Sequence, residues 1–163
     1  MGRVFSAREE RFGRDLEDYE LGDIFRHWPG HTITEAEDHM FCLLTLASSP
    51  LHVDRHFAKT ETEFGRNVVV GTYIYALLLG MSVPDISGRA VANLGLSELR
   101  HLAPMFHGDT LYGESEVLAV RPSASRPSQG ILTVRTDGSN QDGLQVCTFT
   151  RAVLLPRRSK ARS

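Results

Sequence analysis

Apolar residues change their spacing about halfway along this chain. In the first half they recur three or four positions apart, the spacing of a helix that buries one face. The clearest example places five apolar residues on one helical face: Ala36, Met40, Leu43, Leu44 and Ala47. Residues 71–83 are apolar almost without interruption, so we expect a central, fully buried helix that ends at Pro84. In the second half apolar and polar residues alternate, which is typical of strands.

Polar residues mark where the predicted helices begin and end. Thr34 and Glu37 fit a capping box, with Thr34 as the N-cap and Glu37 reaching back to it. Ser48-Ser49-Pro50 cannot easily continue a helix, so we expect this one to stop near Ala47. Residues 55–64 are interpreted as a second, short helix.

Strand-like segments predict one sheet, built mostly from the second half of the chain. A first strand over residues 24–33 is interrupted near Pro29-Gly30. Four longer strands are expected at residues 90–102, 110–120, 131–136 and 144–155. Asp137-Gly138 and Asp142-Gly143 are turn signals before the last of them. The pattern predicts an α+β fold in which an antiparallel sheet wraps around the central helix.

Chain length and exposed sheet edges bear on domains and assembly. The chain has 163 residues, enough for one domain over 1–163, with 1–14 and 157–163 as flexible tails. A sheet with one helix on one face leaves edge strands and an uncovered face. We therefore expect a homodimer or higher homo-oligomer, with the active site near the subunit interface.

Charge and composition exclude several classes of partner. The net charge is −2, which does not favour nucleic acid as a partner. No apolar run reaches the roughly 18 residues that span a bilayer, and the N-terminus is unlike a signal peptide. We expect no membrane partner and a cytoplasmic location. Cys42 and Cys147 lie far apart in apolar settings and are interpreted as buried thiols, without a metal site.

A histidine and a glycine near the middle of the chain are the main candidates for chemistry. His52 follows Pro50 in what we interpret as an irregular loop, and an imidazole titrates near neutral pH. Gly71 opens the central helix, whose first amides are free to bind a substrate oxygen. The alternatives are that His52 only caps a loop or packs under Phe57, and that Gly71 only permits close helix–sheet packing.

Three further polar residues are weaker candidates. Asp54 is either a catalytic acid or the N-cap of the short helix that follows it. Ser49 either holds a water molecule or caps the loop. Arg126 either binds phosphate groups or a carboxylate of a substrate, or lies at a charged loop tip. Four residues are interpreted as parts of solvated surfaces: Asp38, His39, His101 and His107.

Three segments together resemble the MaoC-like hydratases, which include R-specific enoyl-CoA hydratases. They are Pro50-Leu51-His52-Val53-Asp54 with the aromatic residues after it, Val70-Gly71, and residues 102–116. The resemblance implies a hot-dog fold, dimeric assembly and acyl-CoA thioester substrates, with no cofactor because CoA is part of the substrate. It also implies that His52 activates water and that Gly71, beside Val70, binds the thioester oxygen.

The sequence departs from this family where the family carries its catalytic aspartate. That position is Ala47 here, the usual Asn is Ser49, and the residue before the helix glycine, often His, is Val70. Two further segments, Phe41-Cys42-Leu43-Leu44-Thr45 and Ser125-Arg126-Pro127, resemble a subgroup that acts on mesaconyl-CoA, itaconyl-CoA or methylmalyl-CoA. The resemblance implies an enoyl-CoA hydratase or hydroxyacyl-CoA dehydratase. The alternatives are a hot-dog thioesterase and a non-catalytic CoA-ester-binding protein, which Ala47 supports.

Overall fold

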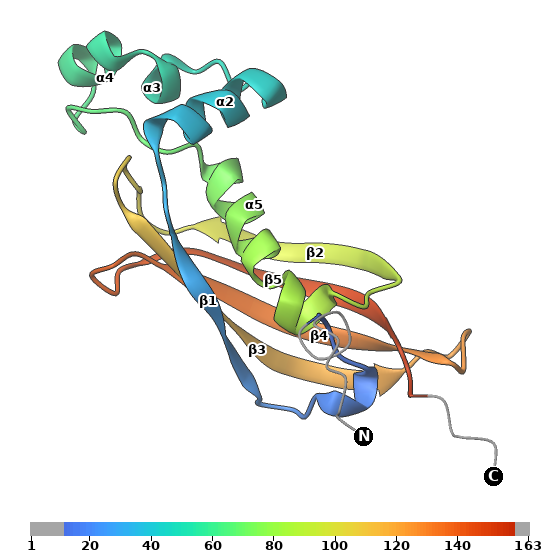
Figure 1. The fold of residues 1–163 in the computed structure, drawn as a ribbon. Coiled ribbons are helices and arrows are strands. Elements are labelled where there is room, and N and C mark those ends of the chain that lie inside the picture. Colours follow the sequence, from blue (N-terminus) through green and yellow to red (C-terminus); the bar gives the residue numbers. More distant parts are fainter. Residues whose placement is uncertain (1–11, 159–163) are drawn as a thin grey trace, which may run out of the picture.

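A five-stranded antiparallel sheet curves around one helix in the computed structural model, which describes residues 12–158 (Figure 1). The strand order is β1-β3-β4-β5-β2. The strands are β1 (Ile24–Thr32), β2 (Ala92–His101), β3 (Thr110–Pro122), β4 (Gln129–Ser139) and β5 (Gln145–Pro156). The helices are η1 (Leu16–Asp18), α2 (Glu35–Thr45), α3 (Pro50–Val53), α4 (Arg55–Glu61), α5 (Gly71–Met81) and η2 (Val83–Ser87). This arrangement confirms the predicted α+β hot-dog fold.

The core lies between α5 and the concave face of the sheet. Ile74 and Leu78 of α5 are fully buried and pack against sheet residues such as Phe149. Gly138 makes room for this contact, because a Cβ there would lie 2.5 Å from Leu78 Cδ1. We predicted a turn at Asp137-Gly138, but both residues are part of β4. Only Asp142-Gly143 lies in the connection to β5.

The central helix is shorter and less enclosed than its sequence predicts. It ends at Met81, and Pro84 lies inside the helical turn η2 instead of ending the helix. Leu77 and Leu79 are only partly buried, because the sheet covers a single side of α5. Within residues 12–158, no helix is long and apolar enough to cross a membrane.

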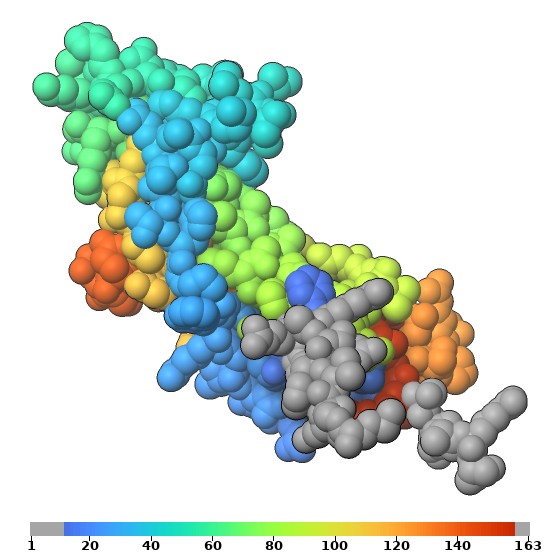
Figure 2. Space-filling view, viewed as in Figure 1, coloured from blue at the N-terminus to red at the C-terminus, as the bar shows by residue number. Residues whose placement is uncertain are grey.

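Helices α2, α3 and α4 extend beyond one end of the sheet (Figure 1), and Figure 2 shows the same projection in space-filling form. Thr34 caps α2 as predicted, accepting a hydrogen bond from the Glu37 N–H. The predicted apolar stripe of α2 is nevertheless exposed, with Leu43 72% and Leu44 77% accessible. Its buried residues are instead Asp38 and Cys42, one turn apart on another face.

Several other local predictions have clear outcomes. Pro50–Val53 is the one-turn helix α3, so His52 does not lie in an irregular loop. The break in β1 is confirmed by the shift in its pairing with β3 between His27 and His31. The Cys147 thiol is buried as predicted, and burial raises its pKa to about 11.

Parts of the two predicted tails contact the body of the protein. The Gly13 N–H donates to the Pro84 carbonyl oxygen, and Arg14 pairs with Asp85 at 3.4 Å. Arg157 pairs with Glu17 at 3.0 Å, which ties the end of β5 to η1. The remainder of both predicted tails, residues 1–11 and 159–163, lies outside the described residues.

The packing of Leu78 gives a test of the core. We expect Gly138→Ala to lower the free energy of unfolding by about 1–3 kcal/mol, because the new Cβ must displace Leu78. Gly80→Ala is the matched control, since among the described residues no atom outside its own helix lies within 4 Å of a Cβ at Gly80. A helical Gly→Ala change there should be neutral or stabilise by up to about 1 kcal/mol. Urea unfolding of both variants measures the difference, and equal effects would contradict this packing.

Candidate active site

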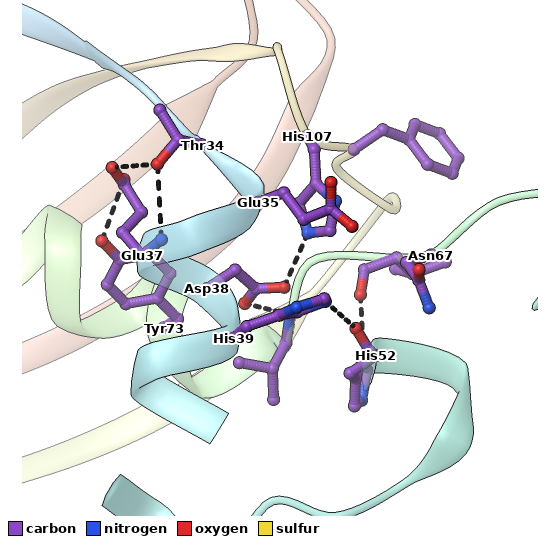
Figure 3. Close-up of polar contacts among 12 residues, drawn as sticks. Thr34, Glu35, Glu37, Asp38, His39, His52, Asn67, Tyr73 and His107 are labelled. Carbon is purple, nitrogen blue, oxygen red and sulfur yellow. Dashed lines mark hydrogen bonds and ion pairs between the residues drawn. The ribbon is translucent and has the colours of Figure 1, made fainter. Parts of the chain in front are cut away.

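His52 has one ring nitrogen fixed by the protein backbone. Its Nδ1 lies 2.8 Å from the Val68 carbonyl oxygen. Because a carbonyl only accepts, Nδ1 carries the proton in this contact, and Nε2 of the neutral ring keeps a free lone pair. His39 Nε2 donates to the His52 carbonyl oxygen at 3.1 Å, which holds α3 against α2 (Figure 3). His52 is therefore held in the tautomer that suits a general base at Nε2.

A mainly apolar pocket of about 380 Å³ brings His52 and Gly71 together. Phe64, Ile74 and Pro104 are among its apolar lining residues, and His101 contributes a second imidazole. Within residues 12–158, the Gly71 N–H has no hydrogen-bond acceptor, as expected at the first position of a helix. The pocket thus combines a proton acceptor with a free amide donor.

Asp38 is buried and connects three segments around this pocket, contrary to the predicted solvated position. The residue has no exposed surface. Its Oδ1 accepts the Val70 N–H at 3.1 Å, and its Oδ2 lies 2.9 Å from His107 Nε2 (Figure 3). His107 was also predicted to lie on the surface, but its side chain is only 17% exposed. Asp38 therefore fixes the backbone immediately before Gly71.

A second polar cluster fastens α2 to α5. Glu37 accepts hydrogen bonds from the Thr34 hydroxyl and, at 3.0 Å, from the Tyr73 hydroxyl. Burial, and then the hydrogen bond to Glu37, raises the pKa of Tyr73 to about 12. Burial alone would raise the pKa of Glu37, but hydrogen bonds from His31, Thr34 and Tyr73 outweigh it and lower the pKa. Glu37 of α2 therefore stays ionised at neutral pH and holds α2 against α5 through its hydrogen bond with Tyr73.

The other candidate residues occupy less central positions. Asp54 accepts the Phe57 N–H at 2.9 Å and is the N-cap of α4. Ser49 is the N-cap residue of α3, but its exposed side chain makes no capping hydrogen bond. Val70 is buried, and its N–H is already bound to Asp38. Arg126 lies in the loop between β3 and β4, at the end of the sheet away from α3 (Figure 1).

The fold and this pocket define a MaoC-like hot-dog protein. The family model for mesaconyl-CoA hydratase matches residues 4–163, and the chain belongs to that family. A mesaconyl-CoA hydratase from Cereibacter sphaeroides is 36% identical over 155 residues, which cover 91% of this chain and 43% of that protein. A beta-methylmalyl-CoA dehydratase from Chloroflexus aurantiacus is 32% identical over 157 residues, covering 87% of this chain and 44% of that protein.

Solved structures agree with the fold. A MaoC-like dehydratase from Rhodospirillum rubrum superposes with a TM-score of 0.79 at 31% identity, covering 91% of this chain and all of that chain. The curated relatives above are much longer, and this chain spans about half of their length. The relatives therefore show the family to which the chain belongs, and not the activity of the whole protein.

The burial of Asp38 predicts a large stability effect. We expect Asp38→Ala to lower the free energy of unfolding by about 3–5 kcal/mol, the range for removing one partner of a buried pair. Asp38→Asn should cost less, because an amide oxygen still accepts the Val70 N–H. Asp54→Ala is the control: it removes an exposed helix cap, a loss of about 1 kcal/mol. Urea unfolding compares the three variants, and an Asp38→Ala loss no larger than the control would overturn this role.

Proposed function

We propose that this chain is an acyl-CoA hydratase or dehydratase, which adds or removes water across the α,β double bond of an enoyl-CoA thioester. The observation that carries the proposal is the pocket shared by His52 and Gly71: among residues 12–158, His52 Nε2 has no hydrogen-bond partner and the Gly71 N–H has no acceptor. Membership of the mesaconyl-CoA hydratase family supports it independently.

The reaction follows from these two groups. In hydration, His52 Nε2 takes a proton from water as the water oxygen bonds to the β-carbon. The electron pair of the double bond shifts toward the thioester, whose oxygen becomes an enolate stabilised by the Gly71 N–H. The α-carbon then takes up the proton that His52 removed from water, the carbonyl re-forms, and the imidazole is neutral again. Dehydration runs through the same steps in reverse, and CoA stays attached throughout, so the reaction consumes no separate cofactor.

The acyl group proposed for this site is a branched C5 dicarboxylic one. The relatives with curated names are a mesaconyl-CoA hydratase and a beta-methylmalyl-CoA dehydratase. Ala47 removes the carboxylate that the wider family uses, and an acyl group with its own carboxylate would bring a negative charge to the site. Fewer fixed carboxylates in the site mean less repulsion of such a substrate.

A second recess is the better candidate for CoA phosphates than Arg126. It has a volume of about 250 Å³, and Lys59, Arg66 and Asn67 are among its lining residues. Val68, which follows Asn67 in the chain, lines the His52 pocket. The Arg66 guanidinium lies 3.7 Å from the centre of the Phe106 ring, which orients it. Lysine and arginine side chains are the usual partners of phosphate groups.

Replacing His52 tests the proposed reaction. We expect His52→Ala to lower kcat by at least about 10²-fold on mesaconyl-CoA or another enoyl-CoA, the low end of a general acid–base effect, with the fold intact. Ser49→Ala should lower kcat less, because another water can replace a hydroxyl that only positions water. The loss of enoyl absorbance measures turnover, and thiol release is followed in parallel. Normal turnover by His52→Ala would refute the site. Thiol release alone would indicate a thioesterase, and binding of CoA esters without turnover a binding protein.

We propose that the working unit is at least a homodimer, formed at the β2 edge. Large apolar side chains on β2 are exposed, with Leu94 49%, Leu96 44% and Leu99 37% accessible. β2 is one of the two edge strands of the sheet, so its outer backbone groups lack a strand partner in the part of the chain that the structure describes. The longer relatives are about twice the length of this chain, which leaves room in each for a second domain of this size.

Light scattering tests the assembly. We expect the purified chain at micromolar concentration to have about twice its monomer mass of 18.1 kDa. The double variant Leu96→Glu, Leu99→Glu should shift it toward the monomer, because it places carboxylates on an edge that must become dry. Leu21→Glu is the control, since Leu21 is 75% exposed and precedes β1 at the other edge of the sheet. A wild-type chain that stays monomeric would contradict the proposal.

A further inference from the structure

We propose that His101 is the second hydrogen-bond donor to the thioester oxygen, acting together with the Gly71 N–H; this inference rests on the proposed function. The sequence gives no sign of the role, because His101 lies in a run of exposed edge-strand residues. The structure brings its ring into the same pocket as His52 and Gly71.

A β-bulge in β2 is what turns His101 toward the pocket. Leu96 pairs with Arg151 of β5, and His101 pairs with Cys147. Arg151 and Cys147 are both buried on the helix side of the sheet, where Arg151 donates to Ser82 and Cys147 belongs to the core around α5. Directly paired residues share a face, so Leu96 and His101 also face α5.

In a regular strand, residues five positions apart would lie on opposite faces. The pairing of β2 with β5 shifts between Ser97 and Arg100, and Glu98 within that interval has a left-handed backbone with φ of 54°. This energetically costly conformation accommodates an extra residue in β2, which reverses the alternation of inward-facing and outward-facing side chains along the strand. Without it, Arg100 would face the pocket in place of the imidazole.

The ring of His101 lies directly against Gly71. A Cβ built on Gly71 would be 2.8 Å from Cε1, 2.9 Å from Nε2 and 3.0 Å from Nδ1 of His101. The nearest atoms to a side chain at position 71 are therefore those of an imidazole, which would have to move to admit it. Within residues 12–158, neither ring nitrogen of His101 has a hydrogen-bond partner, so an N–H is available for a ligand.

An oxygen that accepts the Gly71 N–H at about 2.9 Å would lie beside this ring. That oxygen is the atom on which negative charge develops as the enolate forms, and a donor already in place stabilises the charge without reorganisation. Removing one donor of this kind costs about 10²–10³-fold in kcat. With no carboxylate at Ala47, a second donor on the thioester oxygen also makes the β-carbon more open to attack by water.

The test separates hydrogen-bond donation by His101 from the shape of its ring. His101→Phe keeps a flat ring against Gly71 and removes the N–H, whereas His101→Gln restores an N–H donor. His56→Phe makes the same substitution at an exposed residue of α4 and serves as the control. Turnover is measured with mesaconyl-CoA and crotonyl-CoA. The infrared C=O stretch of bound butyryl-CoA, labelled with ¹³C at the thioester carbon, reports hydrogen bonding without any reaction. Light scattering checks that the assembly is unchanged.

We expect His101→Phe to lower kcat by about 10²-fold or more and to move the bound C=O stretch to higher frequency. His101→Gln should restore most of both, and the control should match wild type. An unchanged kcat and an unchanged C=O frequency in His101→Phe would overturn the proposal. An equal loss of kcat in the Phe and Gln variants would also overturn it, because that result indicates that His101 transfers a proton. If wild type binds butyryl-CoA with a His101-dependent frequency but hydrates neither ester, the inference stands and the proposed function fails.

Discussion

The buried carboxylate of Asp38 is the interaction on which the candidate site depends. It accepts the Val70 N–H at the start of α5 and pairs with His107 from the turn before β3, while its own backbone belongs to α2. Those three segments are far apart in the sequence and surround the pocket. A buried carboxylate is stable only when its oxygens are satisfied, so the three segments must adopt this one arrangement together. The position of the Gly71 amide follows from it.

The fold was largely predictable because its signals are long and periodic. The apolar run at residues 71–81 indicates a helix, and the alternation of apolar and polar residues in the second half indicates an antiparallel sheet. The cap at Thr34 and the break in β1 also follow from local chemistry. The errors fall where tertiary packing overrides a local signal. Asp137-Gly138 has the composition of a turn, but Leu78 needs the space that Gly138 leaves, and the strand continues.

The site was less predictable, because its geometry arises from contacts that no local pattern contains. His52 and Gly71 were identifiable from their setting and from the resemblance to MaoC-like hydratases. The apolar stripe of α2 predicts the wrong buried face, and Asp38 lies on the opposite face, which the structure buries. The one available signal was the spacing of Asp38 and Cys42, four residues apart on the same face. His101 required the sheet register, including a bulge that alternation cannot reveal.

The edge position of β2 links assembly to chemistry. His101 lies at the end of the edge strand β2. Its side chain faces α5 because of the bulge at Glu98, which has a left-handed backbone conformation. β5 supplies hydrogen bonds on one side of that strand, and the other side has no strand partner among residues 12–158. A conformation that costs free energy persists only where its surroundings determine it. Pairing of β2 with a second copy would add the missing constraint, so the formation of a dimer would fix the orientation of the imidazole that faces the Gly71 amide.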